Sequence, residues 1–292
     1  MKKIALFWFT LILFSCNQTR PTKDIAVELA TEDQKENIEK AKNIFYNMYL
    51  PSEMYKVFDK VGAQYDMHIL NPVHNVNLYT TNAKAALNLG VFGVDLSYTK
   101  MFEQNQKLLL YLTVIHKLSL QLGIPDDKFA YALKRIHKNI NNKDSLTAYA
   151  SDIYTNINSY LSENDRNIIA ALVLTGGWVE AVYIACEIAK ENSDNREIYE
   201  RILMQKYSLK HLITLLNSYK DDSNAAQLIP LFSALFDQYN KVVIDYKSGN
   251  LHIDSINRVI NAKTLKIDIK QNEIDSIMSA IIQIRTKIVN AN

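Results

Sequence analysis

The chain has 292 residues, of which 48% are hydrophobic, and its 33 Lys and Arg side chains nearly balance 31 Asp and Glu. This balance, without a dense basic block, excludes the electrostatic surface that nucleic acids and anionic lipids bind. The length and the apolar fraction provide enough material for one large domain. Only two cysteines are present, Cys16 and Cys186.

The N-terminal segment is typical of an exported and lipidated protein. Lys2 and Lys3 precede an apolar run over 4–14 that is too short to cross a bilayer. The sequence Leu-Phe-Ser-Cys at 13–16 resembles a bacterial lipobox, which implies cleavage before Cys16 and lipidation of this residue. We therefore expect three parts in the chain: a signal peptide over 1–15, a tether over 16–31 and a single all-helical domain over 32–292.

Removal of the signal peptide takes away two lysines, so the 33 basic side chains fall to 31 and equal the 31 acidic ones. Without a polybasic stretch, attachment to the membrane is expected through the acyl chains. Cys186 then has no partner for a disulfide, so the domain must be stabilised by its packing. Residues 17–24 lack the acidic run that resembles a surface-export signal, which favours the periplasmic face of the outer membrane.

The domain is predicted to be all-α, an irregular bundle or array of about ten helices. Thr31 and Gln34 form a capping box, while Gly123 ends one helix and Pro125 starts the next. The longer helices are expected at about 82–103, 106–122, 127–139, 145–161, 165–190, 196–205, 209–219 and 224–246. An alternating pattern permits a short extended segment near 264–269.

The last helix carries isoleucines three and four residues apart, at Ile274, Ile277, Ile281, Ile284 and Ile288. Such a stripe permits a small zipper between copies of the chain. It spans barely two heptads, however, which favours a terminal helix packed on the core of its own domain. The oligomeric state is left open by the sequence.

Two segments, 82–98 and 167–183, align without gaps and share seven of seventeen residues, which suggests an internal duplication. Both contain glycines inside helices, where each costs about 1 kcal/mol relative to alanine. We expect Gly90, Gly93 and Gly177 to lie on strips of small residues, and these strips to meet each other or a third helix.

These segments resemble a family of uncharacterised all-helical lipoproteins from Bacteroidetes-type Gram-negative bacteria. The matching stretches are 85–98, Ala-Ala-Leu-Asn-Leu-Gly-Val-Phe-Gly-Val-Asp-Leu-Ser-Tyr, and 174–181, Leu-Thr-Gly-Gly-Trp-Val-Glu-Ala. The resemblance implies a helical lipoprotein and brings no known substrate or catalytic residue.

Asp95 and Glu180 occupy equivalent positions of the two segments, among apolar neighbours, so both carboxylates are expected to be buried. One hypothesis is a pocket in which they converge on a polar or cationic ligand with Tyr98, Tyr183 and Trp178. The favoured interpretation is structural: each acid binds a Tyr hydroxyl, a Lys or a helix N-terminus of a neighbouring helix.

No hydrolase, metalloprotease, phosphate-binding or dinucleotide-binding motif occurs in the chain. His68 and His74, with Asp66 nearby, match no zinc spacing, so neither a metal nor a cofactor is predicted. We expect a non-enzymatic cell-envelope lipoprotein that binds or scaffolds an envelope protein. The alternative is a small-ligand receptor or hydrolase with its site between the two glycine-containing helices, at Asp95 and Glu180.

Overall fold

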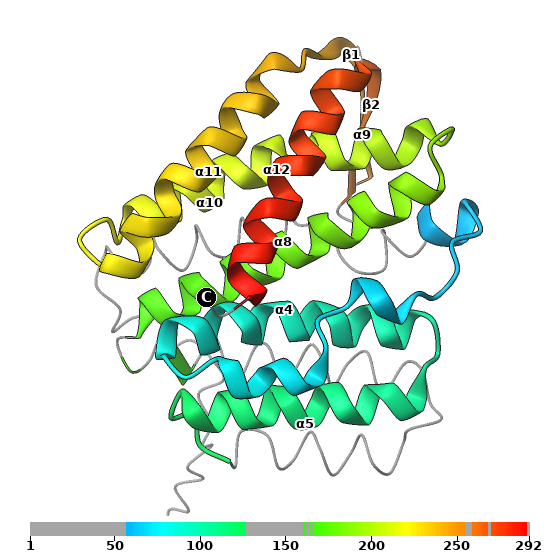
Figure 1. The fold of residues 1–292 in the computed structure, drawn as a ribbon. Coiled ribbons are helices and arrows are strands. Elements are labelled where there is room, and N and C mark those ends of the chain that lie inside the picture. The colour runs from blue at the N-terminus through cyan, green and yellow to red at the C-terminus, as the bar shows by residue number, and fades with distance from the viewer. Residues whose placement is uncertain are drawn as a thin grey trace, which may run out of the picture. The chain divides into compact units, whose positions relative to one another are not determined.

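The computed structural model describes residues 57–126, 160–161, 164, 166–254, 259–267 and 270–290 (Figure 1). These residues all belong to one compact unit, Asn37–Asn292. The predicted signal peptide, Cys16, the tether and the helix expected at 127–139 lie outside the described residues, as does nearly all of the helix expected at 145–161.

The all-α class is confirmed, and the described residues contain about eight helices, whereas the sequence predicted about ten for the domain. The described part contains the short 3-10 helices η1 (Met67–Ile69) and η2 (Val73–Leu78). Its α-helices with defined bounds are α4 (Asn82–Met101), α5 (Asn105–Gln121), α8 (Asn167–Glu191), α9 (Arg196–Met204), α10 (Lys206–Asn217), α11 (Ser223–Lys241) and α12 (Gln271–Val289).

The extended segment is longer than the sequence predicted. Strands β1 (Ile244–Asp254) and β2 (Val259–Ile267) pair antiparallel, with Ile244 opposite Ile267. The helix expected to continue to 246 ends at Lys241, and Val242 is already extended. Val242, Val243 and Ile244 are all β-branched, a side-chain type that favours extended backbone over helix.

Helices α4 and α8 lie against each other at the centre of the unit, and α4 contacts α5 on its other side (Figure 1). The backbones of α4 and α8 touch at two glycines. A Cβ atom on Gly90 would lie 2.0 Å from the carbonyl oxygen of Val173, and one on Gly176 would lie 1.8 Å from that of Leu87. The expected meeting of the two helices through glycine is therefore observed, and the tight positions are Gly90 and Gly176.

The isoleucine stripe of α12 packs inside its own chain. Its five isoleucines are all buried, against a core to which α8 and α11 contribute. The interpretation as a terminal helix docked on the domain is thus confirmed, and the zipper between copies is wrong, because no isoleucine of the stripe remains exposed. The opposite face of α12 is left to solvent.

Among the described residues, α8 is long and apolar enough to cross a membrane, with a mean hydropathy of 1.9 over its most apolar window. However, 72% of that window is buried inside the protein. The α8 sequence is therefore apolar in the manner of a central core helix, which is apolar on every side because other helices surround it.

Candidate functional site

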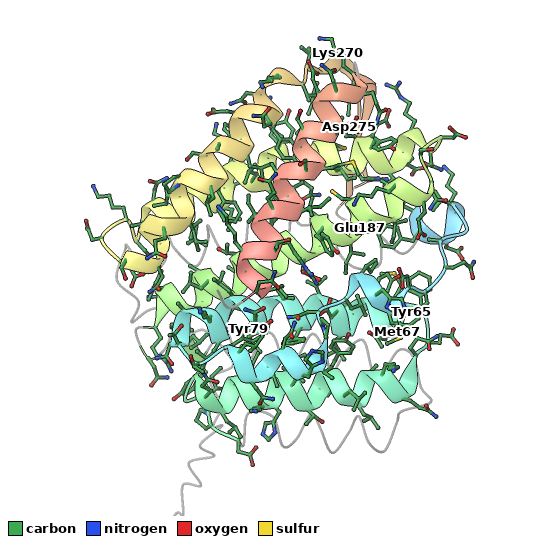
Figure 2. All side chains as sticks on the ribbon, in the orientation of Figure 1. Tyr65, Met67, Tyr79, Glu187, Lys270 and Asp275 are labelled. Atoms are coloured by element: carbon green, nitrogen blue, oxygen red, sulfur yellow. The ribbon has the colours of Figure 1, made fainter. Side chains whose placement is uncertain are left out.

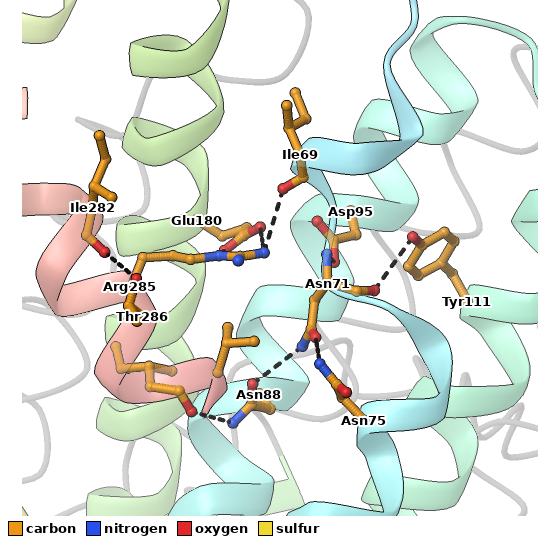
Figure 3. Close-up of polar contacts among 12 residues, drawn as sticks. Ile69, Asn71, Asn75, Asn88, Asp95, Tyr111, Glu180, Ile282, Arg285 and Thr286 are labelled. Atoms are coloured by element: carbon orange, nitrogen blue, oxygen red, sulfur yellow. Dashed lines mark hydrogen bonds and ion pairs between the residues drawn. The ribbon is translucent and has the colours of Figure 1, made fainter. Parts of the chain in front are cut away.

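A buried ionic cluster joins α4, α8 and α12 (Figure 3). Glu180 on α8 has no exposed surface, and Arg285 on α12 binds both of its oxygens. The Nε atom of Arg285 donates to Oε2 at 3.0 Å, and Nη2 donates to Oε1 at 3.1 Å. Nη2 also donates to the carbonyl oxygen of Ile69 at 3.3 Å. This forked geometry is the strongest form of an Arg–carboxylate pair.

Asp95 on α4 completes the cluster from the other side. It is fully buried, and its Oδ2 atom accepts the backbone N–H of Asn71 at 3.1 Å. Its carboxyl group lies close enough to that of Glu180 for the two to influence each other's pKa. Among the described residues, the other oxygen, Oδ1, is buried without a hydrogen-bond partner. Two buried carboxyl groups thus lie near one guanidinium, and Arg285 donates its hydrogen bonds to Glu180.

The two carboxyl groups would carry one more negative charge than Arg285 neutralises, unless one of them is protonated. Burial, followed by the charge of Glu180, raises the pKa of Asp95 well above its ordinary value. Burial also raises the pKa of Glu180, but Arg285 opposes that shift. Burial alone would lower the pKa of Arg285, yet the Glu180 carboxylate raises it, so the guanidinium stays charged. We therefore assign a neutral acid to Asp95 and a carboxylate to Glu180, which gives the partnerless oxygen a hydrogen to donate.

A second set of buried polar groups secures the end of α12. The side-chain nitrogen of Asn71 donates to the hydroxyl of Tyr79 at 2.9 Å and to Oδ1 of Asn88 at 3.3 Å. Tyr79 in turn donates to the carbonyl oxygen of Val289, and Asn88 donates to that of Ile288, both at 3.0 Å. Carbonyl groups in the last turn of a helix have no partner within the helix, so these two bonds satisfy them.

The structure brings together only part of the predicted pocket. Tyr183 lies beside the cluster, with the guanidinium carbon of Arg285 4.4 Å from its ring centre. The Tyr98 hydroxyl instead accepts the backbone N–H of Asp66 at 3.1 Å. Trp178 is fully buried on another side of α8, where its ring N–H donates to the hydroxyl of Ser208 at 3.2 Å.

Sequence reasoning missed Arg285 and Asn71. Arg285 follows Ile281 by four residues and precedes Ile288 by three, so it occupies the core-facing stripe of α12. A lone arginine in such a stripe implies a buried acid as its partner, and this signal was present in the sequence. Asn71 gave no comparable signal, because it lies in irregular backbone before η2.

Glu180 and Asp95 have no exposed surface, so both acids of the cluster are closed to solvent. A hollow of about 560 Å³ lies instead on the surface between α11 and α12, and none of the five predicted ligand-binding residues contributes to it. Among the described residues, no group of three or more His, Cys, Asp or Glu side chains is placed to hold a metal ion.

Comparisons with protein-family models, with curated proteins and with solved structures gave no match for this chain.

Proposed function

We propose that this protein is a non-enzymatic cell-envelope lipoprotein whose helical domain scaffolds or binds an envelope partner. In this proposal, lipidated Cys16 anchors the domain to the periplasmic face of the outer membrane. The order of charged, apolar and lipobox residues at the N-terminus supports the anchor. The observation that carries the scaffolding role is that Arg285 engages both oxygens of Glu180, and that the cluster ties three helices together.

The packing of α4 on α8 supports a scaffold over a receptor or hydrolase. A site between these helices would need space for a ligand, yet their backbones touch at Gly90 and Gly176. A catalytic acid or base would also need access to a reacting group. Asp95 and Glu180 have no exposed surface, and the partners of Glu180 are side chains of the protein itself.

The anchor is tested by expressing the full chain and its Cys16→Ser variant with a clickable fatty acid. We expect the label and membrane sedimentation only for the unchanged chain, because without a basic patch the acyl chains are its attachment. The Cys186→Ser variant is the matched control and is expected to keep both, since Cys186 is buried. An unlabelled chain that still sediments with membranes would contradict the anchor.

The scaffolding role is tested by capturing the lipidated protein from native envelope and identifying proteins and small molecules by mass spectrometry. The proposal expects a co-purifying protein whose recovery is unchanged in the Asp95→Asn variant, because Asp95 lies inside the domain. A tightly held small molecule that is lost in Asp95→Asn, with no change in melting temperature, would support the receptor instead.

A further inference from the structure

The outward face of α12, together with α11, forms the wall of the surface hollow. Eleven residues line it, four from α11 and seven from α12. The side chains used below are Ala234 from α11 and Asp275, Ser279, Gln283 and Lys287 from α12. All five are exposed. Alanine and serine leave little side-chain bulk, so a further helix can approach closely between α11 and α12.

The four residues of α12 form one row, because they are spaced four apart and a helix turns once every 3.6 residues. Asp275 lies at one end and Lys287 at the other, about 18 Å apart at 1.5 Å per residue. Figure 2 shows Asp275 near the N-terminal end of α12. From the N-terminal end of α12 the row runs acid, hydroxyl, amide and base. In an antiparallel copy of the helix the same row runs base, amide, hydroxyl and acid.

Both terminal charges lack an opposite charge in the described part of the chain. Asp275 accepts a hydrogen bond from the neutral side chain of Gln271, and neither Asp275 nor Lys287 belongs to any of the ion pairs there. A surface that carries two unpaired, opposite charges at the ends of a groove is complementary to its own antiparallel copy.

From this self-complementary row we infer that two copies of the chain associate across a two-fold axis that passes between Ser279 and Gln283. The α12 helix of each copy lies in the α11–α12 groove of the other, antiparallel and at the shallow crossing angle of about 20° that suits such packing. Asp275 then faces Lys287 of the second copy, twice by symmetry. This association goes beyond the proposed envelope function and does not depend on the lipid anchor.

The test exploits the charge pattern. In the Asp275→Lys variant both ends of the row are basic, and in Lys287→Asp both are acidic. Each variant alone therefore juxtaposes like charges, and we expect dimerisation about ten-fold weaker than in the unchanged chain, from two exposed pairs of modest strength. A mixture of the two variants restores opposite charges at both contacts, so a heterodimer is expected at the original affinity.

The measurement is native mass spectrometry and sedimentation of the detergent-solubilised full chain, with the two variants distinguished by isotopic labelling. Lys210→Asp, at an exposed site on α10, is the control for net charge and is expected to dimerise normally. Circular dichroism checks that each variant is folded. A chain that stays monomeric up to about 1 mM, a range that includes weak interfaces, would overturn the inference. So would variants that show no preference for each other.

Discussion

The α4–α8 pair and the α11–α12 pair both use small residues, with opposite results. Between α4 and α8, Gly90 and Gly176 let the two backbones touch, and the interface is closed. Between α11 and α12, Ala234 and Ser279 face outward and leave a groove. Small residues therefore allow two helices to approach closely where a second helix is present, as between α4 and α8. Where no second helix covers them, as on α11 and α12, they leave space that a further helix could occupy.

The charges of the two regions differ in the same way. Asp95, Glu180 and Arg285 are withdrawn from water and satisfy one another, whereas Asp275 and Lys287 are exposed and unpaired within the described residues. Removal of one partner from the buried cluster leaves the other charge buried without compensation. Removal of an exposed charge such as Asp275 or Lys287 leaves its surroundings solvated by water. Substitutions should accordingly destabilise the fold at the first region and leave it intact at the second.

The largest effect is expected from Arg285→Met. It leaves the Glu180 carboxylate buried without a counter-charge, which costs about 3–5 kcal/mol of unfolding free energy. Urea denaturation measures this loss. Adding Glu180→Met to the same chain removes the stranded charge and should recover much of the stability. If the double variant is no more stable than Arg285→Met, the loss does not come from the ionic pair.

The next effect separates two adjacent glycines of α8. Gly176→Ala places a methyl group 1.8 Å from the carbonyl oxygen of Leu87, so the helices must separate, at a cost of about 3 kcal/mol. Gly177→Ala is the matched control, because its methyl group would lie at an ordinary 3.6 Å from the carbonyl oxygen of Gly90. Because alanine has a higher helix propensity than glycine, the unfolding free energy of Gly177→Ala should stay within about 1 kcal/mol of that of the unchanged chain. Equal thermal shifts for the two variants would refute the backbone contact.

A smaller effect, dependent on pH, is expected from Asp95→Asn. An amide N–H can donate to Glu180 as the protonated acid does, so the cluster is retained. The pKa of Asp95 is raised in the folded chain, so its contribution to stability is full below the unfolded value, near pH 4, and is lost as pH rises through the folded value. The stability advantage of the unchanged chain over Asp95→Asn should therefore decrease above about pH 4, by at most 1.4 kcal/mol per pH unit.

Urea denaturation of both chains across this pH range gives the difference directly. An advantage of the unchanged chain that grows with pH would mean that Asp95 is ionised when folded, contrary to the charge assignment.

The smallest effect is expected on the outer face of α12. Asp275→Ala and Lys287→Ala should each change the unfolding free energy by less than about 0.5 kcal/mol, because both side chains are exposed. Thermal melting at a concentration low enough to keep the chain monomeric makes this comparison. A loss of more than 1 kcal/mol would show that the row contributes to the fold and is not a free surface.

Much of this fold follows from sequence periodicity, since α4, α5 and α8 begin and end within a few residues of their expected bounds. The burial of Asp95 and Glu180 was also predictable, because each is flanked by apolar residues. The partner of Glu180 was not predicted. Arg285 is 105 residues away; its place in the isoleucine stripe implies a buried acid as its partner, but only tertiary packing shows that this acid is Glu180.

Tertiary packing also explains why Tyr98 and Trp178 do not contact the Asp95–Glu180 cluster. Both lie within a turn of a predicted acid, but a central helix has neighbours on every side, so proximity along the chain does not imply a shared partner. Their hydrogen-bond partners, Asp66 and Ser208, come from a loop and from α10. The hydrophobic pattern identifies a buried residue but does not specify which neighbour it meets.

The central claim is that Asp95 is a neutral acid that ties α4 to the Glu180–Arg285 pair, and infrared spectroscopy tests it most directly. At pH 7 we expect a carbonyl stretch from a protonated carboxylic acid that shifts when the chain carries carbon-13 at the aspartate carboxyl groups. The band should vanish in Asp95→Asn. A spectrum without this band at pH 7, or with a band that persists in Asp95→Asn, would contradict the assignment of the proton to Asp95.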